Sequence, residues 1–227
     1  MPKDWMSTFT NSRIGADKTL PKLLWIKRHW PEMFERIAMV LPSSQDFLVR
    51  RLTGETVGRS RAHREGIPHR TVHIWIAREK DGRCEVLLQK RSRNKDSFPG
   101  LWDTSSAGHI SAGDEPLPSA LRELEEELGL HASAEDLRPI GRFTIRYEKV
   151  FHGALFRDHE IVWLYLCTAP VELGALRPQP EEVEELRWFD LEEVASEIEV
   201  SRARFCVPRE GLGLLRAYLD AQGLPKE

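Results

Sequence analysis

The sequence predicts an α/β protein in which a mixed β-sheet carries helices on both faces, preceded by a short helical extension. From about residue 57 onward, strand-like segments are interspersed with helix-like segments, a pattern typical of a sheet covered by helices. Before that point, a polar start is followed by three helix-like segments. We therefore divide the 227-residue chain into an extension, residues 1–56, and a main domain, residues 57–227.

Proline and capping residues predict the three helices of the extension. The helices are expected near residues 18–29, 31–41 and 44–52. Pro31 stands at the first helical position, where proline is favoured. Ser44 can cap the third helix with its hydroxyl oxygen.

The main domain is predicted to begin with a polar, basic connection at residues 59–70. A first strand at 71–77 and a second at 84–89 are joined by Asp81-Gly82, a hairpin turn signal. The remaining predicted elements are strands at 140–147, 161–167 and 185–189, and helices at 191–198 and 211–221.

Composition and charge limit the classes of function. The net charge is −3, which argues against a nucleic-acid-binding protein that works through general electrostatics. Cys84, Cys167 and Cys206 lack the spacing of a disulfide framework or a zinc site, and we expect reduced thiols in a cytoplasmic protein. We expect neither a signal peptide nor a membrane span, since the longest apolar runs, such as 161–167, are too short.

An acidic helical segment within residues 108–130 dominates the main domain. Glu123, Glu126 and Glu127 are spaced three and four residues apart, so they share one side of a helix. A separate apolar stripe consists of Leu117, Leu121, Leu124 and Leu128. Three neighbouring carboxylates resist ionisation unless a cation lies among them, and Mg²⁺ prefers such oxygen ligands. The alternative is a solvated acidic helix face, the usual fate of a charge run.

The spacing within residues 108–130 resembles the box shared by Nudix hydrolases. That box reads Gly, five residues, Glu, seven residues, Arg-Glu, an aliphatic residue, any residue, Glu-Glu, any residue, Gly and an aliphatic residue. The chain matches it at Gly108, Arg122, Glu123, Leu124, Glu126, Glu127, Gly129 and Leu130. The remaining fixed position holds Asp114 in place of Glu, a carboxylate for a carboxylate.

The resemblance implies that residues 57–227 form a Nudix hydrolase domain, an α/β/α sandwich that hydrolyses a diphosphate linked to another group. It implies Mg²⁺ or Mn²⁺ as the cofactor, bound by Glu123, Glu126 and Glu127. Gly108 matches the glycine that lets the loop approach the metal and the phosphates.

The same resemblance gives roles to the neighbouring residues. Arg122 holds the carboxylates by ion pairing, with Asp114 as its acidic partner, and Gly129 fits a left-handed helix stop. A free carboxylate then takes a proton from the attacking water. Glu123 is the first candidate for this general base and Glu160 the second.

The flanks of the box resemble one Nudix branch, the isopentenyl diphosphate isomerases and their hydrolase relatives, over about residues 57–200. The segment FPGLWDTSSAGHI, residues 98–110, carries this resemblance. The isomerases build a metal site from histidines and two acids, and the matching residues here are His63, His69, His109, Asp158 and Glu160. The isomerases also need a cysteine shortly before Gly-His, where this chain has Ala107, so hydrolysis is favoured over isomerisation.

A basic cluster precedes the box across a turn and consists of Lys90, Arg91, Arg93 and Lys95. Lys90 and Arg91 are candidate contacts for the substrate phosphates, as is His109. The alternative for the basic cluster is a solvated hairpin end, where charged residues contribute little.

A second resemblance covers about residues 17–55, which are similar to a fragment of a xylulokinase-type sugar kinase. The segments LPKLLWIKRHWPEMFERIAMVL and DFLVRRLTGE carry it. A fragment of this size lacks a nucleotide cleft and a Gly-rich phosphate loop, so we assign it no kinase activity.

Together these observations predict a metal-dependent hydrolase of a nucleoside diphosphate derivative or a prenyl diphosphate. The alternatives are an enzyme like isopentenyl diphosphate isomerase and a non-catalytic Nudix module that binds a nucleotide or a protein. The expected partner is a small-molecule diphosphate, without nucleic acid or membrane. A homodimer is among the oligomeric states left open, as is the identity of the substrate.

Overall fold

The computed structural model describes residues 57–201 and 203–222, together with the single residue Arg28. The three helices predicted for the extension and the resemblance to a sugar-kinase fragment lie outside the described residues, apart from Arg28. The boundary at residue 56 stays a prediction.

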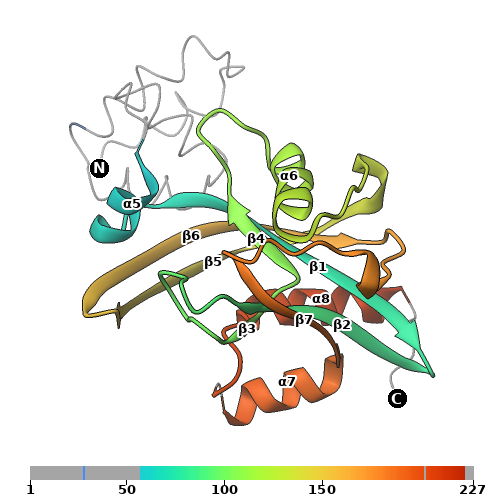
Figure 1. Ribbon diagram of the computed structural model, residues 1–227. Coiled ribbons are helices and arrows are strands. Elements are labelled where there is room, and N and C mark those ends of the chain that lie inside the picture. Colours follow the sequence, from blue (N-terminus) through green and yellow to red (C-terminus); the bar gives the residue numbers. More distant parts are fainter. Residues whose placement is uncertain (1–27, 29–56, 202, 223–227) are drawn as a thin grey trace, which may run out of the picture. The chain divides into compact units, whose positions relative to one another are not determined.

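The described residues form a seven-stranded mixed sheet with helices on both faces (Figure 1). The strands are β1 (His69–Lys80), β2 (Arg83–Arg91), β3 (Trp102–Asp103), β4 (Ser106–His109), β5 (Leu137–Phe151), β6 (Ala154–Cys167) and β7 (Val183–Asp190). The helices are α5 (Arg59–Glu65), α6 (Pro116–Leu128), α7 (Leu191–Val200) and α8 (Arg209–Ala221), with short 3₁₀ turns at Ala134–Asp136 and Leu173–Ala175. The predicted α/β class with a mixed sheet is confirmed.

Strand β1 organises the sheet because its partner changes along its length. One edge of β1 pairs in parallel with β6, and β6 pairs with β5. The other edge pairs with β4 over Thr71–Ile74 and then with β2 over Ala77–Lys80. At this change of partner the Ser105 hydroxyl accepts from the Ile76 N–H at 2.8 Å and donates to the Leu87 carbonyl at 2.6 Å. Ser105 therefore pairs two backbone groups at the junction, as buried backbone groups require.

Two apolar layers cover the two faces of the sheet. Alternate residues of β1 point to opposite faces, so Val72 and Ile74 pack toward α6 while Trp75 packs toward α7 and α8. On α6, Leu124 and Leu128 are fully buried, and Leu117 and Leu121 pack against the same layer. The leucine stripe predicted from spacing is therefore confirmed. Because this stripe packs on the sheet, Glu123, Glu126 and Glu127 lie on a different side of α6.

The structure corrects the prediction for residues 59–70. Arg59–Glu65 form helix α5 instead of a connection, and Gly66 ends it with φ of 69°. The helix buries Ala62 and His63. A short, charged helix that buries an alanine and a histidine shows no apolar periodicity in its sequence, which is why the pattern did not reveal it.

The hairpin of β5 and β6 is longer than the predicted strands at 140–147 and 161–167. The two strands pair in one register from the turn to Gly141, and the register shifts between Gly141 and Pro139. The turn residues His152 and Gly153 both have positive φ, 50° and 77°, as a tight hairpin requires. The added residues are mostly exposed, so they lack the apolar pattern of a buried strand. Among the described residues, no helix is long and apolar enough to cross a membrane.

Two glycine substitutions test the helix stop that was predicted at Gly129. Gly129 has φ of 64° and follows the last residue of α6, and an added Cβ would lie 2.8 Å from the Arg177 Cβ. We expect Gly129→Ala to lower the free energy of unfolding by about 1–2 kcal/mol, because a left-handed conformation strains any residue with a Cβ.

The control is Gly213→Ala, in the interior of α8, where an added Cβ meets nothing within 4 Å. This change should raise the free energy of unfolding by about 0.5–1 kcal/mol. Urea denaturation measures both variants, and effects of the same sign would contradict the assignment.

Candidate functional site

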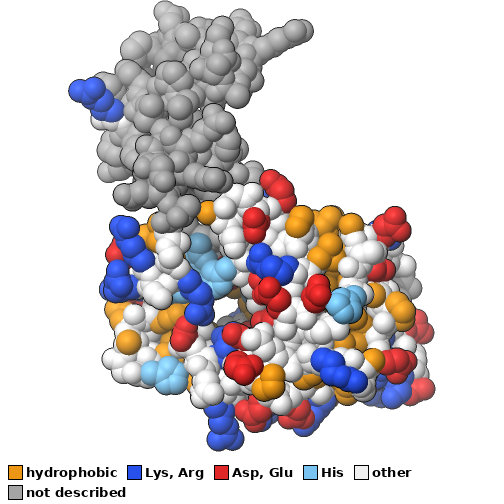
Figure 2. All heavy atoms as spheres, turned by 45° about the horizontal axis from the view of Figure 1, so that its top comes forward, with side chains coloured by type: hydrophobic (Ala, Val, Ile, Leu, Met, Phe, Trp, Pro, Cys, Tyr) orange, Lys and Arg blue, Asp and Glu red, His pale blue; other side chains and the backbone are white. Residues whose placement is uncertain are grey.

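A cavity of about 760 Å³ collects the polar residues that the sequence singled out. It is lined by Glu123, Glu126 and Glu127 of α6, by His63 and His109, and by acids of β6. Cations from the loop after β2 complete the wall. Figure 2 shows histidine, basic and acidic side chains gathered around a hollow on this face of the domain.

Glu127 of α6 is buried at the inner wall of the cavity, and three donors hold its carboxylate. The Ser106 hydroxyl donates to Oε2 at 2.8 Å, the Ala107 N–H at 3.1 Å and the Gln89 amide at 3.2 Å. Its other oxygen, Oε1, accepts no hydrogen bond from the described residues. Burial raises the pKa of Glu127 above its usual value, and the hydrogen bond from Ser106 opposes this.

Glu123 lies one turn earlier on α6, directly against Gly108. A Cβ on Gly108 would overlap the Glu123 carboxylate, so the glycine leaves the space that this carboxylate fills. Arg122 donates to Glu123 Oε1 at 2.9 Å, while burial raises the pKa of Glu123. Glu126 is exposed at the mouth of the cavity, 3.7 Å from the Arg122 guanidinium.

Arg122 also ties α6 to the end of β4. Its guanidinium donates to the His109 carbonyl at 3.0 Å and to Asp114 Oδ2 at 3.3 Å. Asp114, which stands where the Nudix box has its first glutamate, is therefore in contact with Arg122. This arginine holds β4, the loop that follows it and α6 in one arrangement.

Histidines from α5, β1 and β4 converge beside the glutamates. His69 Nδ1 lies 2.9 Å from the Ile67 carbonyl, so the Nδ1–H donates to that oxygen and Nε2 is the ring nitrogen that faces Asp158. His69 Nε2 and His63 Nδ1 lie 3.7 Å and 3.5 Å from Asp158 Oδ1. These three buried atoms have no hydrogen-bond partner among the described residues, an arrangement that a bound cation would satisfy.

Burial, together with the neighbouring His69, lowers the pKa of His109 to about 3. The ring of His109 is therefore neutral near pH 7, the form in which histidine binds a metal. Its Nε2 lies 3.2 Å from His63 Nε2. Two sets of ligand atoms lie within 4.8 Å of one another, those of His63, His69 and His109 and those of His69, Asp158 and Glu160. Glu123, Glu126 and Glu127 line the same cavity but belong to neither set.

Glu160 lines the cavity, and its carboxylate has two partners on β1. Thr71 donates to its Oε2 at 2.9 Å, and His73 Nε2 lies 3.5 Å from the same oxygen. Burial alone would raise the pKa of Glu160, but His73 holds it below its usual value. The pKa of His73 is raised by Glu160 in spite of burial. His73 and Glu160 therefore form a buried ion pair.

The basic cluster at the end of β2 and in the loop that follows divides between the outer surface and the cavity. Lys90 donates to Glu184 at 2.8 Å and is not among the residues that line the cavity. Arg93 has a side chain that is 84% exposed, 3.6 Å from the same glutamate. These two cations lie with the solvated end of the strand.

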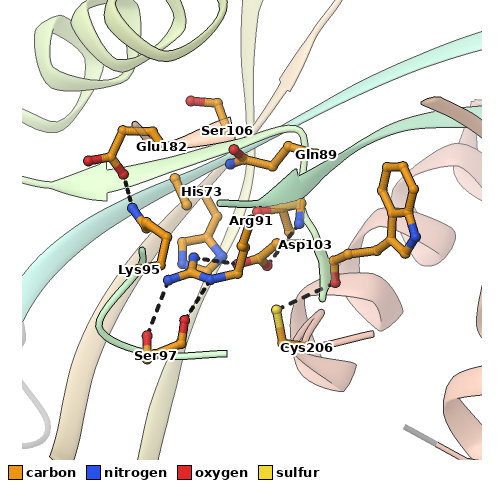
Figure 3. A network of polar contacts seen from close by, with 12 residues as sticks. His73, Gln89, Arg91, Lys95, Ser97, Asp103, Ser106, Glu182 and Cys206 are labelled. Atoms are coloured by element: carbon orange, nitrogen blue, oxygen red, sulfur yellow. Dashed lines mark hydrogen bonds and ion pairs between the residues drawn. The ribbon is translucent and has the colours of Figure 1, made fainter. Parts of the chain in front are cut away.

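Arg91 and Lys95 line the cavity (Figure 3). Arg91 donates to Asp103 Oδ2 at 3.0 Å and to the Ser97 carbonyl at 2.9 Å, so it fixes the loop after β2. Lys95 lies farther along this loop and pairs with Glu182. Burial lowers the pKa of Lys95.

Sequence reasoning missed three residues at this site. Gln89 and Ser106 bind the Glu127 carboxylate, and Cys206 lines the cavity although it is distant in sequence from Ala107. For Gln89 the sequence signal was a polar residue directly after the apolar run Val86-Leu87-Leu88. Burial raises the pKa of the Cys206 thiol well above its usual value, so the thiol is protonated near neutral pH.

The class of protein is defined by the fold and by the α6 glutamates, of which Glu123 lies against Gly108. The NUDIX domain family matches residues 67–207, and the chain therefore belongs to this family. "Nudix hydrolase 3" of Arabidopsis thaliana is 45% identical over 143 residues, which are 62% of this chain. The chain spans only 18% of that relative's length.

Other comparisons cover more of the matched proteins. An isopentenyl-diphosphate Delta-isomerase of Dinoroseobacter shibae is 34% identical over 149 residues, 66% of this chain and 79% of the isomerase. A NUDIX hydrolase structure from Alicyclobacillus acidocaldarius matches with a TM-score of 0.50 at 16% identity, over 67% of this chain and 91% of that one. The structure supports the fold alone. The family and the relatives confirm the predicted enzyme class, a Nudix phosphoanhydride hydrolase.

Substitution of Gly108 tests the contact with Glu123. In Gly108→Ala the added Cβ meets the end of a flexible side chain, which can turn away. We expect the free energy of unfolding to stay within about 1 kcal/mol of the wild type, while displacement of the carboxylate lowers diphosphate hydrolysis at least ~10-fold. Gly174→Ala, where a Cβ meets nothing within 4 Å, is the control. Unchanged hydrolysis by Gly108→Ala would contradict this role.

Proposed function

We propose that this Nudix enzyme is a metal-dependent hydrolase that cleaves the diphosphate of a prenyl diphosphate or of a nucleoside diphosphate derivative. One observation carries the proposal. One cavity is lined by three carboxylates of α6, by four members of the histidine–acid cluster and by two cations: Glu123, Glu126, Glu127, His63, His109, Asp158, Glu160, Arg91 and Lys95. A diphosphate needs this combination, because cations must offset its charge and a carboxylate must activate water.

The residues present fit Mg²⁺ or Mn²⁺. Glu123, Glu126 and Glu127 offer the oxygen ligands that suit either ion. The cluster of His63, His69, His109, Asp158 and Glu160 adds imidazole nitrogens, and its unpartnered buried atoms support a cation there. A bound divalent ion would neutralise the phosphate oxygens and lower the pKa of a bound water.

The two candidate bases are alike in exposure and pairing but differ in pKa. Glu160 accepts from Thr71 and pairs with His73, which holds its pKa below the usual value. Glu123 pairs with Arg122, yet burial raises its pKa above the usual value. The carboxylate with the higher pKa is the better proton acceptor, which favours Glu123 as the general base and leaves Glu160 as a ligand.

Arg91 and Lys95 are suited to the diphosphate itself. Lys95 pairs with Glu182 across the cavity wall, and an incoming phosphate can replace that carboxylate as its partner. Arg91 keeps the loop in place through Ser97 and Asp103. Lys90, with its partner on the outer surface, has no role in this proposal.

The group linked to the diphosphate faces aromatic side chains. Phe98, Tyr147 and Phe156 line the cavity, and Phe98 packs edge-on against Tyr147 with ring centroids 5.4 Å apart. Such a wall suits a prenyl chain or a nucleobase. The isomerase relative supports the prenyl class, and Ala107 supports hydrolysis over isomerisation.

A screen with Mn²⁺ and Mg²⁺ tests the substrate class. The panel contains nucleoside diphosphates, nucleotide sugars, dinucleotides and prenyl diphosphates, scored by phosphate release and by the organic product. Isopentenyl diphosphate should release phosphate. Because the protonated thiol of Cys206 lines the cavity, the assay also scores dimethylallyl diphosphate, whose accumulation would make the protein an isomerase. Metal-dependent binding without turnover of any substrate would make it a binding module.

Removal of single charges on α6 tests the role of its glutamates. We expect Glu126→Gln and Glu127→Gln each to lower turnover at least ~100-fold, because each removes a ligand to the cation. Glu125→Gln is the control, since Glu125 is 61% exposed and pairs with His131 away from the cavity. Circular dichroism checks folding. Full activity in both test variants would refute the assignment.

The histidine cluster predicts a second metal equivalent. In His69→Ala the lone pair that faces Asp158 is lost, so we expect a titration with Mn²⁺ to show one equivalent fewer than the wild type. His131→Ala, whose side chain is 79% exposed, should bind as the wild type does. An unchanged stoichiometry in His69→Ala would argue for a single cation on α6.

A further inference from the structure

We propose that Gln89 and Ser106 are positioning residues that divide the Glu127 carboxylate into one oxygen held by the protein and one left for a cation. The inference deepens the proposed function and rests on it. Neither residue is adjacent to Glu127 in sequence, and the sequence pattern assigned neither a role.

The contacts converge on a single atom. The Ser106 hydroxyl, the Ala107 N–H and the Gln89 amide all donate to Glu127 Oε2, at 2.8, 3.1 and 3.2 Å. The other oxygen, Oε1, receives no hydrogen bond from the described residues. Three donors on one oxygen fix the rotation of the carboxylate about its last bond and turn Oε1 toward the cavity that Glu127 lines.

The donors come from two strands, so they fix the carboxylate from more than one side. Gln89 lies on β2, opposite Asp103 of β3 and Leu186 of β7. Ser106 begins β4, the strand that pairs with β1. Figure 3 shows Gln89 and Ser106 together above the Arg91 and Asp103 pair. Because its hydrogen-bond donors lie on β2 and β4, the carboxylate of Glu127 is fixed relative to the sheet as well as to its own helix, α6.

The burial of Gln89 has no other explanation in the core. Gln89 is 3% exposed and Ser106 fully buried, and an unpaired buried amide is unfavourable. Within the described part of the chain, the side chain of Gln89 makes one hydrogen bond, and its acceptor is Glu127. An apolar residue at position 89 would be buried without needing a hydrogen-bond partner. We therefore attribute the buried amide at this position to its hydrogen bond with the Glu127 carboxylate.

The neighbouring serine makes a matched comparison. Ser105 and Ser106 are both fully buried, and each hydroxyl donates one short hydrogen bond. The Ser105 hydroxyl hydrogen-bonds to the backbone of β1 and β2, whereas the Ser106 hydroxyl hydrogen-bonds to the Glu127 carboxylate. Loss of Ser105 therefore tests stability, and loss of Ser106 tests the orientation of the carboxylate.

The experiment measures Mn²⁺ affinity of the full chain by titration against the electron paramagnetic resonance signal of free Mn²⁺. The variants are Ser106→Ala, Gln89→Met and Ser105→Ala, with Ser106→Thr to restore the hydroxyl. Residues that orient a metal ligand contribute about 10–100-fold to metal affinity. We expect Ser106→Ala and Gln89→Met to weaken Mn²⁺ binding by about this factor, and Ser106→Thr to recover it.

Ser105→Ala should lower the melting temperature without a change in Mn²⁺ affinity. The inference is overturned if Ser106→Ala and Gln89→Met bind Mn²⁺ as Ser105→Ala does. Glu127→Gln separates the two proposals. If Glu127→Gln weakens Mn²⁺ binding while the positioning variants do not, only this inference fails. If Glu127→Gln binds Mn²⁺ normally, the metal role of α6 fails as well.

Discussion

The burial of the Glu127 carboxylate is the constraint on which the rest of the site depends. A buried charge without partners is costly by several kcal/mol, so the fold has to bring donors to it from separate strands. On the same helix, Leu124 and Leu128 are fully buried against the sheet. Apolar packing therefore sets the distance of α6 from the sheet and its rotation about the helix axis. The hydrogen bonds to Glu127 set the position of α6 along the sheet.

Strand β4 connects the two groups of metal-type ligands. Gly108 leaves the space for the Glu123 carboxylate, and the next residue, His109, belongs to the histidine cluster. Arg122 joins them, because its guanidinium binds both Glu123 and the His109 carbonyl. Two adjacent residues of one strand thus place the glutamates and the histidines at the same cavity.

The parts of the site that sequence predicts are those fixed by local geometry. The helical repeat places the glutamates and the leucine stripe on different sides of α6, and Gly129 ends the helix as its position indicated. Contacts that depend on strand register were not predictable. Nothing in the spacing separates Lys90, on the surface, from Lys95, in the cavity. Helix α5 was missed because it buries a histidine that only the folded cavity accommodates.

Position 107 shows how one scaffold can keep its ligands while its chemistry changes. Ala107 holds Glu127 through its backbone N–H, a group that every residue except proline provides. The side chain at this position lines the cavity and has no part in that contact. A cysteine or an alanine there is therefore compatible with the same Glu127 arrangement. A thiol at position 107 can therefore be absent without loss of the carboxylate geometry on which the proposed hydrolysis depends.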